Sequence, residues 1–98
     1  MTATGAADIL ATDSEEGTQI MTDDIVILGS ARTAIGTFGG AFSGTPPIDL
    51  ATAASKAAME RAGVAPDQIG QVVFGHVINT EPHDMYLSRA ASHAAGVP

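Results

Sequence analysis

Two short apolar runs on either side of a helix-like stretch constrain the fold more than any other feature. The runs, IVIL at residues 25–28 and VVF at residues 72–74, are rich in β-branched residues, as strands covered on both faces are. The stretch between them begins with Thr45 and two prolines and stops at Gly63, the order of signals typical of a helix. A strand, a helix and a strand in this order are typical of a βαβ unit. The sequence therefore predicts an α/β fold with a parallel or mixed sheet.

The first predicted helix, residues 46–62, has a narrow face of small residues. Lys56 and Glu60 lie four residues apart on its exposed side. If Gly63 adopts the left-handed conformation, Val64 can close a Schellman motif onto Met59. We expect the buried face to consist of Leu50, Ala54, Ala57, Ala58 and Met59.

A second helix is predicted near the end of the chain. It begins at His83 or Asp84, because Pro82 precedes it, and it runs to Ala95, because Gly96 follows. A helical face of apolar residues is expected to pack inward. That inner face consists of Leu87, Ala91 and Ala94.

The start of the chain differs in composition from the rest. Residues 1–24 contain six carboxylates and no lysine or arginine. We therefore expect residues 1–22 to be a disordered acidic extension and residues 23–98 to be the first part of a folded domain. Met21 directly precedes the first apolar run, as an initiator would, so the natural start is predicted there.

The net charge of −7 argues against nucleic acid or an anionic membrane as a partner. The acidic start lacks the basic and apolar parts of a secretory peptide and the arginines of a mitochondrial presequence. No apolar run approaches the roughly 18 residues of a transmembrane helix. We expect a cytoplasmic protein.

The glycine-rich stretch SARTAIGTFGG, residues 30–40, lies where many α/β proteins hold a phosphate. The glycines at positions 36, 39, 40 and 44 do not fit G-x-G-x-x-G, and Lys56, the one lysine, follows no P-loop. Arg32 could neutralise a phosphate, but an arginine at such a place is more often bonded to a carboxylate or a backbone carbonyl. We therefore predict tight turns here and no nucleotide site.

Three histidines suggest a metal site, with Glu81 or Asp84 as the carboxylate ligand. His83 and His93 are expected at opposite ends of one helix, roughly 15 Å apart at 1.5 Å per residue, which is too far to share an ion. His93, in the last turn, is instead suited to interact with the helix dipole. No metal ligand is therefore predicted.

His76 follows Gly75 at the predicted end of the second strand, where α/β proteins often place catalytic residues. An isolated histidine at such a place is more often a hydrogen-bonded structural residue, so both interpretations stay open.

Two further groups of residues are candidates for chemistry. Ser88 and Ser92 share the second helix with His93, but a nucleophile and a base in adjacent positions point in different directions, so no triad is expected. Met85 and Tyr86 could line a ligand pocket, although a role in the core or at an interface is the more common one.

Three stretches, taken in order, resemble a known family. They are IVILGSARTAIGTFGGAF at residues 25–42, MERAGVAPDQIGQVVFGHV at 59–77 and EPHDMYLSRAASHAAGVP at 81–98. Together they are similar to the amino-terminal segment of thiolases, the acetyl-CoA acetyltransferase and β-ketothiolase family. TEPHDMYLSR, residues 80–89, resembles the broad-specificity bacterial β-ketothiolases in particular. Ala34 stands where many relatives have proline, and His76 where several have asparagine or glutamine.

The resemblance implies the layered αβαβα thiolase fold and a CoA-dependent acyltransferase. Such an enzyme condenses acetyl-CoA with an acyl-CoA, or cleaves 3-oxoacyl-CoA by thiolysis, in fatty acid metabolism or in the synthesis of polyhydroxyalkanoate precursors. A cysteine thiolate in Asn-x-x-Cys-x-Ser-Gly forms the acyl-enzyme. A histidine in Gly-His-Pro and a cysteine in Cys-x-Gly-Gly-Gly complete the site. The resemblance also implies acyl-CoA as substrate, no covalently bound cofactor, and a homodimer or homotetramer.

None of these catalytic motifs is present in the chain, which has no cysteine and follows His76 with Val77. The chain stops just before the place where the resemblance puts the first cysteine. We therefore expect a truncated thiolase with no catalytic, cofactor-binding or metal-ligating residue of its own, inactive alone and with an incomplete sheet. The alternative is a small non-enzymatic α/β module that binds a partner protein.

Overall fold

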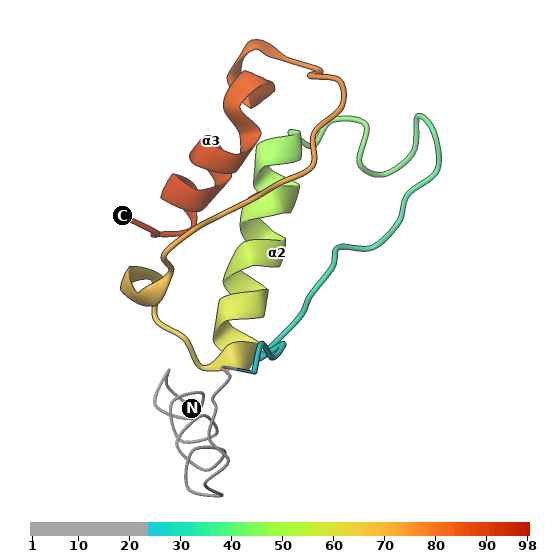
Figure 1. Cartoon of the computed structure of the whole chain (residues 1–98). Coiled ribbons are helices and arrows are strands. Elements are labelled where there is room, and N and C mark those ends of the chain that lie inside the picture. Colours follow the sequence, from blue (N-terminus) through green and yellow to red (C-terminus); the bar gives the residue numbers. More distant parts are fainter. Residues whose placement is uncertain (1–23) are drawn as a thin grey trace, which may run out of the picture.

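The computed structural model describes residues 24–98 (Figure 1). Its helical elements, in chain order, are α2 (Pro47–Ala62), η1 (Pro66–Gln68), η2 (Pro82–Tyr86) and α3 (Leu87–Ala94). The predicted acidic extension, residues 1–22, and the predicted start at Met21 lie outside the described residues.

Helix α2 confirms the first predicted helix, and local signals explain both of its ends. Pro47 occupies its first turn, where the missing N–H costs nothing. At the other end Gly63 is left-handed, with φ of 67°. The Gly63 N–H donates to the Glu60 carbonyl, and the Val64 N–H donates to the Met59 carbonyl, each at 3.1 Å. These two bonds are the predicted Schellman motif.

The second predicted helix is shorter than expected. Pro82 starts the 3₁₀ turn η2, and the α-helix begins only at Leu87. The turn η2 is separated from α3 at Tyr86, because the φ of −116° and ψ of 57° of this residue are not helical. The prediction that the helix begins at His83 or Asp84 is therefore wrong.

The end of α3 repeats the motif that ends α2. Gly96 is left-handed, with φ of 93°. Its N–H donates to the His93 carbonyl, and the Val97 N–H donates to the Ser92 carbonyl, both at 3.0 Å. An Ala-Gly-Val sequence lies at the end of both helices, so the same Schellman motif ends α2 and α3.

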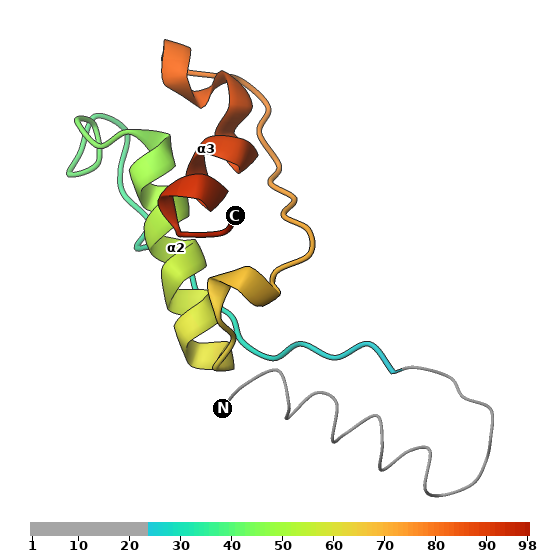
Figure 2. The ribbon, with the colours of Figure 1, turned by 90° about the vertical axis from the view of Figure 1, so that its left-hand side faces the viewer.

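The core lies where α2 packs against α3, and small residues allow the close approach (Figure 2). Ala91 is fully buried, and Ala62, Leu87 and Ala95 are nearly so. The predicted inner residue Ala94 is exposed, because the buried stripe of α3 is centred on Ala91, four residues from both Leu87 and Ala95. In α2 the predicted inner residues are partly buried, and Lys56 and Glu60 are exposed as predicted.

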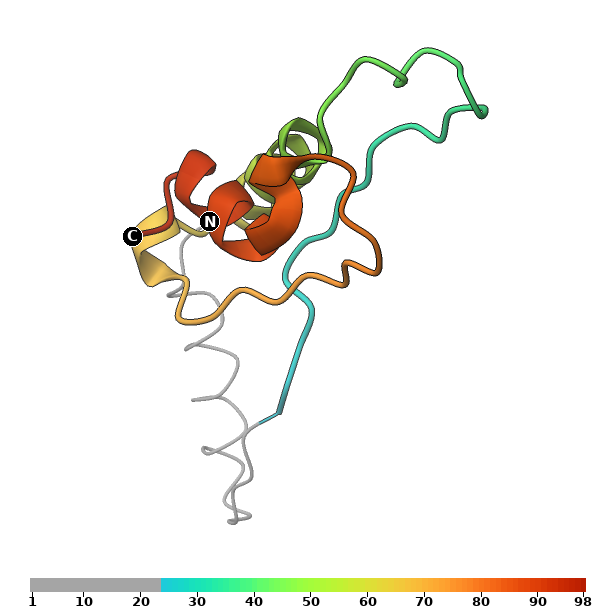
Figure 3. The ribbon, with the colours of Figure 1, turned by 90° about the horizontal axis from the view of Figure 1, so that it is seen from above.

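The two apolar runs are extended and form no strand within residues 24–98, so the predicted strands at 25–28 and 72–74 are not confirmed. Figures 2 and 3 show the segments that contain them on the same side of the helix pair. A strand requires a neighbour for its backbone hydrogen bonds, and the two runs do not pair with each other.

The extended segment that contains residues 25–28 is fixed to the end of α2. A Cβ atom on Gly29 would lie 2.8 Å from the Ala62 backbone nitrogen and 2.9 Å from the Ala58 carbonyl oxygen. The Arg61 guanidinium donates a hydrogen bond of 2.8 Å to the Ser30 carbonyl. Only glycine allows the backbone to approach the helix this closely.

Candidate functional site

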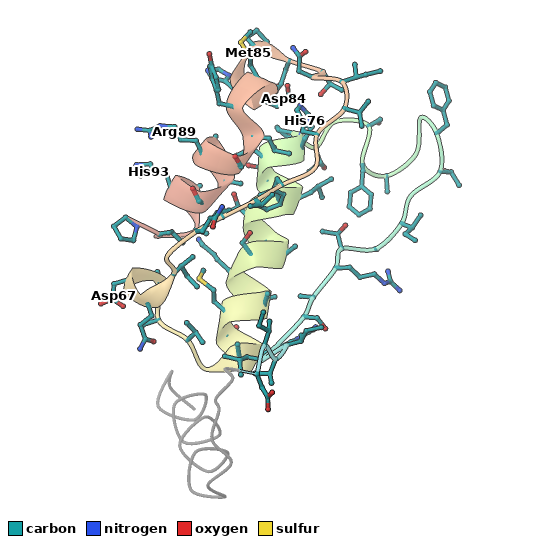
Figure 4. All side chains as sticks on the ribbon, in the orientation of Figure 1. Asp67, His76, Asp84, Met85, Arg89 and His93 are labelled. Carbon is teal, nitrogen blue, oxygen red and sulfur yellow. The ribbon has the colours of Figure 1, made fainter. Side chains whose placement is uncertain are left out.

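His76, Thr80 and Asp84 form a polar cluster. It lies where the extended segment that contains residues 72–77 meets η2 (Figure 4). Asp84 is fully buried, with an exposed fraction of 0%. A buried carboxylate requires hydrogen-bond donors, because burial removes it from water.

Thr80 supplies those donors. Its backbone N–H donates to both carboxylate oxygens of Asp84, at 3.1 Å to Oδ1 and 2.9 Å to Oδ2. Its hydroxyl donates to Oδ2 at 2.7 Å. The backbone N–H of Asp84 donates to the Glu81 carbonyl at 3.3 Å, which closes the first turn of η2. The side chain and the backbone of Asp84 together fix residues 80–84 as one unit.

These contacts determine the charge of Asp84. Burial raises the pKa of its carboxyl group, but the hydrogen bonds from Thr80, and to a lesser extent the nearby His76, lower it. The balance leaves the pKa below its ordinary value of 3.8. Asp84 is therefore a carboxylate throughout the neutral pH range.

His76 faces this carboxylate from the extended segment. Its Nε2 lies 3.6 Å from Asp84 Oδ1 and, among the described residues, has no hydrogen-bond partner. The side chain remains 22% exposed. This contact with a buried carboxylate supports a structural role for His76. The hydrogen bond expected for that role is not formed by Nε2 within residues 24–98.

Asp84 does not join the histidines in a metal site, as one interpretation of the sequence suggested. No group of three or more histidine, aspartate or glutamate side chains within residues 24–98 is arranged to hold a metal ion. His83 lies in η2 and not in the helix, and it lines the same hollow as His93. The prediction that one helix separates these two histidines is therefore wrong. His93 does occupy the last turn of α3, as predicted.

The glycine-rich stretch forms successive turns, as predicted. The Gly40 N–H donates to the Thr37 carbonyl, and the Ser43 N–H donates to the Gly40 carbonyl. Gly39 has a positive φ of 68°. Arg32 donates to the neighbouring Thr33 carbonyl at 3.0 Å, so its bond to a backbone carbonyl is confirmed.

The remaining candidates of the second helix have other surroundings. The Ser92 hydroxyl donates to the Arg89 carbonyl at 3.0 Å, within its own helix. Met85 and Tyr86 are 58% and 72% exposed, so neither belongs to a core in the described part of the chain. Their role at an interface stays a prediction.

The Thr80–Asp84 contact was missed in the sequence. The signal is Thr-Glu-Pro-His-Asp, in which Pro82 marks the start of a turn and Asp84 is its third residue. In a capping box an acidic residue at this position reaches back to the residue before the turn. In this chain the Asp84 carboxylate instead accepts a hydrogen bond from the backbone N–H of Thr80, one residue earlier. In the sequence, Glu81 and Asp84 suggest carboxylate ligands only because they lie near histidines, whereas in the structure the Asp84 carboxylate is bonded to Thr80.

The comparisons with known proteins agree on one family. The family model described as "Thiolase, N-terminal domain" matches residues 25–98. The beta-ketothiolase BktB of Cupriavidus necator is 48% identical over 77 residues, which are 79% of this chain and 20% of that relative. The cytosolic acetyl-CoA acetyltransferase of Rattus norvegicus is 45% identical over 76 residues, 78% of this chain and 19% of that relative. An acetyl-CoA acetyltransferase of Clostridioides difficile is 37% identical over 75 residues, 76% of this chain and 69% of that relative.

The chain spans about a fifth of the length of the first two of these relatives. Among residues 24–98, no helix has both the length and the apolar character that crossing a membrane requires. The match to the family model covers most of the chain and implies an α/β fold. The chain therefore belongs to the thiolase family, within its amino-terminal domain.

Proposed function

We propose that this chain serves as the amino-terminal part of a CoA-dependent acyltransferase. The reaction is the condensation of acetyl-CoA with an acyl-CoA, or the reverse thiolysis of a 3-oxoacyl-CoA. The observation that carries the proposal is the match of residues 25–98 to the thiolase amino-terminal domain. The relatives' names, β-ketothiolase and acetyl-CoA acetyltransferase, support the same reaction class.

The contribution of this chain to such an enzyme is structural. Acyl transfer through a thioester intermediate requires a thiolate nucleophile, and the chain has no cysteine. Its residues supply the α2–α3 pair and two extended segments. They also supply the Thr80–Asp84 cluster, which fixes the connection between the second extended segment and η2. We expect the reacting groups to come from other segments of the enzyme, and the chain alone to be inactive.

The extended segments are proposed to be strands of the mixed sheet in a layered αβαβα fold. Residues 72–77 alternate between partly buried and exposed positions, which is the two-residue period of a strand. The side chains that face outward are strongly apolar, with Val73 80% and Val77 96% exposed. Residues 26–29 and Ile69 border an open hollow of about 340 Å³ above Met59 and Ala62 of α2. An unfilled apolar space beside two extended segments is consistent with a sheet that other segments complete.

The setting of this enzyme is part of the same proposal. Acyl-CoA is its substrate, no cofactor is covalently bound, and it functions in the cytoplasm as a homodimer or homotetramer. Fatty acid metabolism and the supply of polyhydroxyalkanoate precursors are its expected roles. The cytosolic relative from Rattus norvegicus supports the compartment, and the net charge of −7 makes nucleic acid or an anionic membrane an unsuitable partner.

Thiolysis of acetoacetyl-CoA tests this function. We expect turnover by the polypeptide that the complete gene encodes and only background turnover by the 98-residue chain. The control is the complete polypeptide with alanine in place of the cysteine of Asn-x-x-Cys-x-Ser-Gly, which should be inactive. Turnover by the 98-residue chain, or its absence from the complete polypeptide, would contradict the proposal.

A further inference from the structure

The outer face of α3 has an open hollow that the acyltransfer chemistry does not use. Its volume is about 390 Å³, and it is lined by Pro82, His83, Tyr86, Arg89, Ala90 and His93. We propose that this hollow binds a phosphate monoester through His83, Arg89 and His93.

Local structure brings these three side chains together. Arg89 and His93 are four residues apart, so they lie on one face of the helix. Figure 4 shows both side chains projecting from the side of α3 that faces away from α2. His83 reaches the same hollow because η2 folds back before α3 begins at Leu87.

Arg89 differs from the other two arginines of the chain. Arg32 donates to the Thr33 carbonyl, and Arg61 donates to the Ser30 carbonyl. The guanidinium of Arg89 forms neither a hydrogen bond nor an ion pair with any residue from 24 to 98. Its donors remain available for an external acceptor.

The charge of the hollow is opposite to that of the chain. No carboxylate is among its lining residues, although the chain as a whole carries −7. Arg89 supplies the formal positive charge of this lining, and an anion bound in the hollow is paired with it.

Phosphate fits this donor set better than a carboxylate. The arginine fork donates two parallel hydrogen bonds to phosphate oxygens, and each imidazole can donate a further one. A phosphate monoester carries about −1.5 to −2 charge at neutral pH and three acceptor oxygens, whereas a carboxylate carries one charge and two oxygens. Pro82, Ala90 and the ring of Tyr86 provide an apolar floor for the organic part of the ester.

An NMR titration of the 98-residue chain tests the proposal, with inorganic phosphate and phenyl phosphate as probes and chloride added to keep the ionic strength constant. The Arg89 Nε–H and the ring signals of His83 and His93 should shift and saturate with either phosphate. Phenyl phosphate should bind several-fold more tightly, because its ring lies on the apolar floor. Arg89→Gln should weaken binding by at least about tenfold, because it removes the charge and the two parallel hydrogen bonds of the guanidinium.

The matched control is Lys56→Gln, which removes the same charge from the exposed side of α2. It should change the affinity by less than about twofold, since exposed charges at a distance are largely screened. Helix content, measured by circular dichroism, should be the same in both variants. Signals that do not saturate, equal effects of the two variants, or shifts that chloride alone reproduces would overturn the proposal.

Discussion

The buried carboxylate of Asp84 connects the turn η2 to the residues that precede it. Asp84 is fully buried, and its carboxylate accepts three hydrogen bonds from Thr80. His76 Nε2 lies 3.6 Å from Oδ1 of the same carboxylate. Asp84 therefore joins the turn η2 to the extended segment before it, which contains His76 and Thr80.

The first prediction concerns the pH dependence of this arrangement. Because the pKa of Asp84 is lowered in the folded chain, its contribution is complete above the ordinary value of 3.8 and is lost as the pH falls through the lower folded value. Hydrogen exchange of the Thr80 amide measures the effect. Its protection factor should be constant near neutral pH and should fall at acidic pH.

The control for this experiment is Asp84→Asn. The variant should lower the protection of the Thr80 amide at neutral pH, because an amide group replaces one acceptor oxygen by a donor. It should also abolish the acid-dependent loss, since no carboxylate remains to be protonated. A Thr80 protection factor that stays the same from neutral pH down to the acid unfolding of the chain would rule out this account of Asp84.

At the scale of elements, the helix ends are determined by glycines in a conformation that other residues adopt at a cost. Gly63 and Gly96 have φ of 67° and 93°, and each is followed by a valine that completes the motif. These ends were predictable because their causes lie within six consecutive residues. The start of α3 was not predictable in this way, because it follows the non-helical backbone of Tyr86.

The second prediction is that Gly63→Ala destabilises the end of α2. An alanine in the left-handed region costs about 1–2 kcal/mol, so the amides of the last turn should lose about 5- to 30-fold in protection. Gly44→Ala is the control, because a Cβ there meets nothing within 4 Å and φ is not positive. Equal protection in the two variants would show that the left-handed glycine does not determine this helix end.

The third prediction concerns the contact between the first extended segment and α2. Gly29→Ala places a Cβ 2.8 Å from the Ala62 backbone nitrogen, so the segment must move away from the helix. Overpacking of this kind costs about 1–3 kcal/mol. The measurement is the chemical shift of the Arg61 side-chain N–H, which should report the loss of its bond to Ser30.

Gly70→Ala is the control for that variant. It lies in the other extended segment, and a Cβ there meets nothing within 4 Å. The Arg61 signal should therefore stay unchanged. If Gly29→Ala also leaves it unchanged, the close approach of residues 29 and 62 does not hold the segment in place.

For the whole molecule, the absence of the predicted sheet from residues 24–98 has one physical cause. Helices satisfy their backbone hydrogen bonds within themselves, whereas strands require partners. The apolar runs at 25–28 and 72–74 have strand composition, and much of their apolar surface remains exposed, with Ile25 at 99%, Ile27 at 89% and Val73 at 80%. Val72 and Phe74 are partly buried. Sequence composition identified what these runs are suited to form, but not whether this chain contains the neighbours they need.

The last prediction follows from the family and from this exposed apolar surface. If the extended segments are strands of a thiolase sheet, the amides of Val72, Val73 and Phe74 should exchange rapidly in the monomeric 98-residue chain. In the polypeptide that the complete gene encodes, the same amides should exchange at least about a hundredfold more slowly, because neighbouring strands then accept their hydrogen bonds.

Hydrogen exchange at these three amides, measured by mass spectrometry on both polypeptides, tests most directly whether this chain is one part of a thiolase sheet. The expected result is fast exchange in the chain alone and slow exchange in the complete polypeptide, with the amides of α2 protected in both. Slow exchange of residues 72–74 in the monomeric chain, or fast exchange in the complete polypeptide, would contradict the account.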